Sequence, residues 1–108
     1  MKPISLIEGM ELEDAAADLK TSERVEQYRL GKQAIYFPAL PRKKYLPFAA
    51  IRSVTRSHRN ISAGQCVPVE EQRPALLLQT EQGEFRLEPE REKSAERLQR
   101  AIEAAIRT

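Results

Sequence analysis

Proline and glycine divide this chain into short segments, and they limit the fold more than any other feature of the sequence. Of the 108 residues, four are glycine and seven are proline. They stand at Pro3, Gly9, Gly31, Pro38, Pro41, Pro47, Gly64, Pro68, Pro74, Gly83 and Pro89. Because proline breaks helices and cannot donate to a sheet ladder, segments this short exclude a mainly helical fold. We therefore expect most of the middle of the chain to form strands.

Size and composition indicate one soluble, ordered domain. The chain is 41% apolar and 31% charged, close to the values for globular proteins. No apolar run approaches the roughly 20 residues needed to cross a bilayer, and the first ten residues do not have the pattern of a secretion signal. The single cysteine, Cys66, cannot form an internal disulfide. These features predict a cytosolic protein.

In the first third of the chain, periodicity predicts a helix over 10–20, with its acidic residues at its N-terminal end or facing outward. Residues 24–30 then alternate as a strand does, and residues 33–37 are rich in β-prone side chains. Gly31 lies between these two segments. The pattern predicts a tight hairpin that turns at Gly31.

Shorter strands are predicted beyond the hairpin. Residues 43–46 and 51–57 are expected to be strands on either side of a turn at 47–50. Residues 58–64 and 70–74 are predicted to be loops, and 65–69 a further short strand.

The last third contains the strongest patterns. Residues 75–80 and 84–88 flank a glycine-bearing connection and predict a hairpin, with Leu76, Leu78, Phe85 and Leu87 toward the core. Residues 90–107 predict a helix. Its apolar face consists of Ala95, Leu98, Ile102, Ala105 and Ile106, and Glu96–Arg100 and Glu103–Arg107 are favourable i,i+4 pairs.

Charge is strongly polarised along the chain. Residues 31–66 contain seven cations and no acid, whereas the segments before and after carry net charges of −3 and −2, for a total of +2. A locally basic surface attracts phosphates, anionic lipid or acidic protein. The candidate contacts are Arg42, Lys43, Lys44, Arg52, Arg56 and Arg59.

Each part of this basic segment has two interpretations. Arg42, Lys43 and Lys44 are adjacent in a connection after a strand, where they could meet an anion together or keep a sheet edge soluble. Arg52 and Arg56 are expected on one strand face. They could bind phosphate or carboxylate, or pair with acids such as Glu84 or Glu88.

The sequence argues against catalysis, a metal site or a cofactor. His58 is the only histidine and Cys66 the only cysteine, so no zinc-binding spacing exists. Ser57 and Ser62 lie near His58, but no nucleophile-elbow motif surrounds either serine. Nucleic acid is disfavoured because the few aromatic residues are also needed for the core.

Three segments resemble the bacterial pleckstrin-homology-like (PH-like) domains, near the GRAM type. Residues 28–37 resemble the family's strand, turn and aromatic-rich second strand, and residues 46–54 its proline–aromatic corner. Residues 78–87 resemble its last hairpin. The resemblance implies an α+β fold over 24–108. In that fold, about seven short antiparallel strands form a partly open barrel capped by the C-terminal helix, and residues 1–23 form an extension with a short helix.

The resemblance also implies an expectation about function. Such domains bind phosphoinositides, peptides or protein surfaces and are not catalytic. In this chain the first hairpin turn is too tight to cradle a lipid headgroup, and tryptophan is absent. We therefore expect a noncatalytic binding or scaffolding module with a protein partner. The alternative is weak contact with anionic lipid or another phosphate-bearing surface, and a small enzyme ranks third.

Overall fold

The computed structural model describes residues 3–38, 43–61 and 71–107, with residues 58–61 and 71–73 described by their backbone alone. The elements in chain order are β1 (Ile4–Ser5), α1 (Ala15–Lys20), β2 (Glu23–Val25), β3 (Tyr28–Leu30), β4 (Ala34–Phe37), β5 (Lys44–Pro47), η1 (Phe48–Ala50), β6 (Ile51–Ile61), β7 (Glu71–Thr80), β8 (Gly83–Leu87) and α2 (Glu92–Ile106). The fold is therefore α+β, as predicted.

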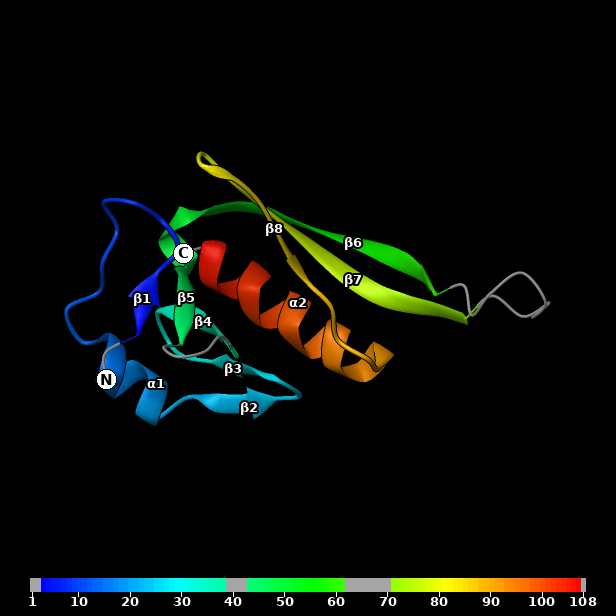
Figure 1. The fold of residues 1–108 in the computed structure, drawn as a ribbon, viewed down its shortest axis with the longest axis horizontal. Helices are drawn as coiled ribbons and strands as arrows, with labels where there is room; N and C mark the ends of the chain where they lie inside the picture. Colours follow the sequence, from blue (N-terminus) through cyan, green and yellow to red (C-terminus); the bar gives the residue numbers. More distant parts are fainter. Residues whose placement is uncertain (1–2, 39–42, 62–70, 108) are drawn as a thin grey trace.

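The strands form two separate sheets. One has five strands in the order β1-β5-β4-β3-β2, and the other has three in the order β6-β7-β8. All neighbours are antiparallel except β1 and β5, which are parallel. Helix α2 contacts β6 and β7 of one sheet and β2 of the other, and it runs between the two sheets in Figure 1. The helix thus joins the two sheets.

The larger of two apolar clusters lies where both sheets meet α2. Ile35 and Leu46 reach it from the five-stranded sheet, Leu76 from the other sheet, and Leu98 and Ile102 from the helix. All five side chains are fully buried. Since burying one such side chain contributes about 1.5–3 kcal/mol, the inner face of α2 determines how the sheets pack.

The predicted barrel is not closed in this structure. Among the described strands, no ladder joins β5 to β6 or β2 to β8. Side-chain contacts bridge β2 to the segment after β8. Glu26, between β2 and β3, accepts hydrogen bonds from the backbone N–H groups of Glu90 and Arg91 at 2.7 and 3.0 Å. The sheets are therefore held together by side chains and by α2.

The predicted strand over 24–30 is wrong, because it is a hairpin of its own. Val25 pairs with Tyr28, and Glu26 adopts a φ of +55° at the start of the two-residue turn. Positive φ suits the tight turns of hairpins but is uncommon outside glycine. The predicted hairpin around Gly31 is confirmed, and its strands are β3 and β4.

The two loops predicted at 58–64 and 70–74 are also partly wrong, because strands extend into both. Residues 58–61 belong to β6 and residues 71–74 to β7. Pro74 was predicted to lie in a loop, but it belongs to β7 and pairs with His58 of β6. The pairing of β7 with β8 extends only as far as Leu76. At Pro74 the sheet therefore has two strands, and one edge of β7 has no described neighbour, which is where a strand tolerates proline. The strand predicted at 65–69 lies outside the described residues.

Other predictions are confirmed. Strands β4 and β5, the turn at η1, the β7–β8 hairpin and α2 all lie within a few residues of the predicted positions. Leu76, Leu78 and Leu87 are buried, Phe85 is partly buried, and Arg100 pairs with Glu96 at 2.5 Å.

Candidate functional site

The basic residues predicted as a binding patch are dispersed in the structure. Arg52 forms an ion pair with Glu81, while Arg56 forms one with Glu92 and donates a second hydrogen bond to Gln99 of α2 at 3.1 Å. The register shift between residues 51 and 53 leaves Arg52 outside the regular ladder. Pairing with acids is found, but with Glu81 and Glu92, not with Glu84 or Glu88.

The remaining candidates of this segment form no described cluster. Lys43 and Lys44 are exposed at the start of β5, and neither pairs with an acid among the residues that the structure describes. Arg42 lies outside the described residues. Arg59 is described only as part of the β6 backbone.

The residues weighed for catalysis give no described constellation. His58 is described only by its backbone in β6, and Cys66 and Ser62 lie outside the described residues. Within the described part of the chain, no three His, Cys, Asp or Glu side chains come together as a metal site requires.

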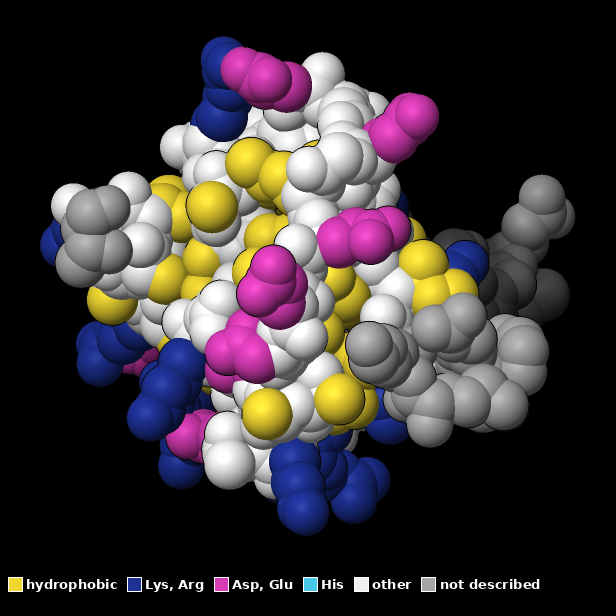
Figure 2. Space-filling model, turned by 90° about the vertical axis from the view of Figure 1, so that its left-hand side faces the viewer, with side chains coloured by type: hydrophobic (Ala, Val, Ile, Leu, Met, Phe, Trp, Pro, Cys, Tyr) yellow, Lys and Arg dark blue, Asp and Glu magenta, His cyan; other side chains and the backbone are white. Residues whose placement is uncertain are grey.

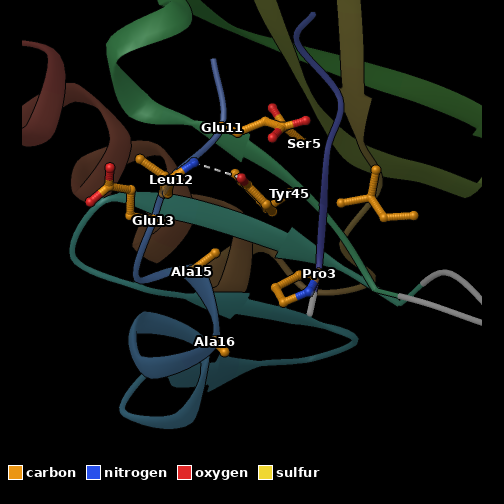
Figure 3. A pocket seen from close by; sticks show the side chains of 9 residues that line it. Pro3, Ser5, Glu11, Leu12, Glu13, Ala15, Ala16 and Tyr45 are labelled. Atoms are coloured by element: carbon orange, nitrogen blue, oxygen red, sulfur yellow. Dashed lines mark hydrogen bonds between the residues drawn. The ribbon is translucent and has the colours of Figure 1, made fainter. Parts of the chain in front are cut away.

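A groove lies between β1 and the start of α1. Residues 3–5 form one wall, residues 11–13 with Ala15 and Ala16 form the other, and Tyr45 of β5 contributes to the floor. Figure 3 shows Pro3 and Leu12 on opposite sides of the hollow with Tyr45 between them. Its volume is about 560 Å³, within the range typical of ligand sites. We call it the β1 groove.

Tyr45 determines the shape of this groove. Its hydroxyl accepts a hydrogen bond from the backbone N–H of Leu12 at 2.8 Å, a group that a helix through this segment would leave at its N-terminal end. Residues 10–14 are not helical, and α1 begins at Ala15 and not at residue 10 as predicted. This non-helical segment provides the wall opposite β1.

Asp18 fixes α1 to the five-stranded sheet. The sequence predicts its carboxylate outward or near the helix start, but the side chain is only 6% exposed. It accepts hydrogen bonds from the N–H groups of Lys32 at 2.8 Å and Gln33 at 3.2 Å, and from the Tyr36 hydroxyl at 2.8 Å. A buried carboxylate is stable only with such partners. The β3–β4 turn supplies them.

Gly31 makes room for this carboxylate. A Cβ atom at position 31 would lie 2.1 Å from Asp18 Oδ2 and 2.9 Å from the Tyr36 ring. Burial, and then the hydrogen bond to Asp18, raise the pKa of Tyr36 well above its usual range. The hydroxyl therefore stays protonated and continues to donate to Asp18. This network positions α1, and with it one wall of the groove.

The wall formed by β1 carries a free strand edge. The N–H groups of Ile4 and Leu6 donate to Lys43 and Tyr45 of β5, both at 2.8 Å. Because successive residues of a strand direct their backbone groups to opposite sides, the N–H and C=O of Ser5 point away from β5. Neither group bonds to another residue that the structure describes. Among the residues that the structure describes, strand β1 is thus an edge strand, and the backbone groups of Ser5 are its one pair without a partner there.

The surface around the groove is acidic and partly apolar. Glu8, Glu11, Glu13 and Asp14 are all exposed, and residues 8–14 contain no cation. Large hydrophobic side chains are exposed in the described ranges only at Ile4 and Met10, at 39% and 40%. Figure 2 shows acidic side chains over the middle of this face, hydrophobic groups between them, and Lys and Arg toward its margins.

Next to this face, Gln82 fastens the N-terminal loop to the β7–β8 turn. Its side-chain amide accepts a hydrogen bond from the Glu8 N–H at 3.0 Å and donates one to the Glu8 carbonyl at 2.9 Å. Both backbone groups of Glu8 are satisfied as they would be in a strand ladder. The loop that carries the acidic residues is therefore attached at its beginning.

Sequence reasoning missed the β1 groove because it looked for a site among the cations. The available signal was the acidic segment 8–14, which was interpreted only as the start of a helix.

In comparisons with known proteins, no family model, no curated protein and no solved structure matches the chain. Within the described ranges, no helix has the length and hydrophobicity needed to cross a bilayer.

Proposed function

We propose that this protein is a noncatalytic binding module whose partner is another protein, and that the partner docks in the β1 groove. The observation that carries the proposal is the groove itself. It combines a concave wall-and-floor shape, a free strand edge at Ser5 and the exposed hydrophobic side chain of Ile4. Exposed apolar groups beside a concave surface are typical of interaction sites.

The charges around the groove support a protein partner over an anionic one. Glu11 and Glu13 lie on the groove wall and repel phosphate or lipid headgroups. Arg52 and Arg56, which could have attracted such groups, are already in ion pairs. Each ion pair places a carboxylate beside the guanidinium and so lowers the local positive charge that a phosphate would meet.

We also propose that the fold is a variant of the PH-like type. The order of elements supports it: an antiparallel run from β2 to β5, a second antiparallel run from β6 to β8, and α2 as the last element. Strand β1 and helix α1 are then additions to the five-stranded sheet. In this proposal the groove is built mainly by the additions.

The alternative function, contact with an anionic surface, depends on Lys43 and Lys44, which are exposed and unpaired among the described residues. It is tested by cosedimentation with phosphatidylglycerol vesicles. Because the Debye length falls from about 30 Å at 0.01 M salt to about 8 Å at 0.15 M, we expect weak association at the lower salt and none at the higher. Vesicle binding that persists at 0.15 M and disappears when Arg42, Lys43 and Lys44 are all alanine would favour this alternative.

Photocrosslinking tests the protein-binding proposal directly. A photoreactive amino acid replaces Ala16, which is exposed on the groove wall, and the purified chain is irradiated in lysate of the source cells. A matched variant carries the same group at Glu96, exposed on α2. We expect one protein to be crosslinked from position 16 and not from position 96. Equal or absent crosslinking at both positions would refute the proposal.

A further inference from the structure

We propose that the partner segment in the β1 groove is an extended, basic peptide that adds to β1 as a strand and places a Lys or Arg side chain beside Glu11 and Glu13. This inference rests on the proposed function and adds the chemistry and conformation of the partner.

The backbone of β1 favours an extended partner. An edge strand is a template for another strand, because its outward N–H and C=O groups lack partners. In β1 these are the groups of Ser5, since Ile4 and Leu6 both donate to β5. Strand addition at such an edge is a common way to recognise peptides. The side chain of Ser5 does not block it, because its hydroxyl is turned to the carbonyl oxygens of Met10 and Ile7 at 2.7 and 3.0 Å.

The depth of the groove favours alternating side chains. Successive side chains of a strand point to opposite faces, so every second residue of an added strand would face the floor. There it meets the partly exposed side chain of Leu12, beneath which Tyr45 and Ala15 are buried. The Tyr45 hydroxyl accepts a hydrogen bond from the Leu12 N–H, and Leu12 supplies the apolar part of this surface. Small or medium apolar residues fit this position.

The negative charge of the groove wall formed by residues 11–13 favours a cationic side chain in the partner. Glu11 and Glu13 are exposed and form no ion pair with any other described residue. Both line the groove, and Figure 3 shows them on either side of Leu12 along the same segment. A carboxylate can accept two parallel hydrogen bonds from a guanidinium. An acidic or phosphorylated segment would be repelled by the same pair.

Panning a phage-displayed library of ten-residue random peptides against the full-length chain tests the inference. We expect enrichment of peptides in which Lys or Arg alternates with apolar residues. Enrichment of acidic peptides, or of none, would overturn the inference. The protein-binding proposal would still stand in either case if a partner is crosslinked from position 16, so the two failures are distinguishable.

Charge variants then test the role of the two carboxylates. The chain with both Glu11→Gln and Glu13→Gln should bind the selected peptide about fivefold more weakly, since each is a solvent-exposed pair. Glu8→Gln is the matched control, because it removes the same charge from the same loop but Glu8 does not line the groove. Equal effects of the double variant and the control would overturn the placement of the cation.

N-methylated versions of the selected peptide test strand addition without altering the protein. Methylation of alternate backbone amides removes donors along one edge of the peptide only. We expect one of the two alternating sets to abolish binding, by at least about tenfold as for a lost buried hydrogen bond, and the other set to retain it. Equal tolerance of both sets would refute strand addition, even if the peptide still binds.

Discussion

Replacing Gly31 by alanine should displace the Asp18 carboxylate from its site under the β3–β4 turn. The new Cβ would lie 2.1 Å from Asp18 Oδ2, 2.7 Å from its Cγ and 2.9 Å from the Tyr36 ring. Distances this short cannot be relieved by small shifts, so the Asp18 side chain must move. The hydrogen bonds from Lys32, Gln33 and Tyr36 are then stretched or lost.

The loss in free energy of unfolding depends on whether any of these three donors is left without an acceptor. The backbone N–H groups of Lys32 and Gln33 are near solvent and can bond to water. The Tyr36 hydroxyl is buried, but the Ala15 carbonyl oxygen at 3.2 Å is a second acceptor for it. The cost therefore has two parts. Overpacking contributes about 1–3 kcal/mol, and the weakening of hydrogen bonds to the charged Asp18 acceptor contributes about 1–2 kcal/mol. We expect a total loss of about 2–5 kcal/mol.

Urea denaturation followed by far-ultraviolet circular dichroism measures this loss. The control is the same substitution in the Asp18→Ala background, where the clashing carboxylate is absent. There we expect Gly31→Ala to cost about 1 kcal/mol or less, because only the contact with the Tyr36 ring remains. If Gly31→Ala costs the same in both backgrounds, its effect does not pass through Asp18 and the reasoning is refuted.

Three further predictions concern how α2 is held. Leu98→Ala should lower the free energy of unfolding in urea by about 2–5 kcal/mol, because Leu98 is fully buried; a loss below about 1 kcal/mol would mean that α2 is not part of the core. Glu26→Gln should cost about 0.5–2 kcal/mol in the same assay, since the carboxylate caps two backbone N–H groups just before α2; an unchanged stability would contradict that role. The hydrogen bonds and charge of Arg97 lower the pKa of Glu23. The ion pair therefore stabilises the folded state fully at pH values above the ordinary glutamate pKa. This stabilisation is lost as the pH falls through the lowered pKa of Glu23. Carboxyl titration by NMR should find this pKa raised in Arg97→Ala, and an unshifted pKa would rule out the interaction.

The parts of the fold that local pattern determines could be predicted. The β7–β8 hairpin and α2 were predicted because alternation and helical periodicity continue through each element without interruption. The turn at Glu26 could not be predicted, since it contains neither glycine nor proline. Its positive φ is stabilised by bonds to residues 90 and 91, more than sixty positions away along the chain.

The candidate site was hidden for a similar reason. Asp18 belongs to a stripe of acids that a helix normally exposes, and only the turn after β3 makes a buried place for it. Strand β1 has two residues and pairs with β5, forty positions later, so no local alternation marks it. The cations, in contrast, were conspicuous in the sequence. Their described partners Glu81 and Glu92 come from distant segments.

The parallel pairing of β1 with β5 has a consequence for how the protein is made. Ile4 cannot find Lys44, its partner in the sheet, until the ribosome has added about forty more residues, which takes about 2–8 s at typical rates of synthesis. Strand β1 therefore cannot join the five-stranded sheet before β5 has been made, and such long-range pairing forms slowly. Only two residues then hold this strand, so we expect its amides to exchange with solvent deuterium before those of β4. The β1 groove should therefore open more readily than the centre of the sheet that carries it.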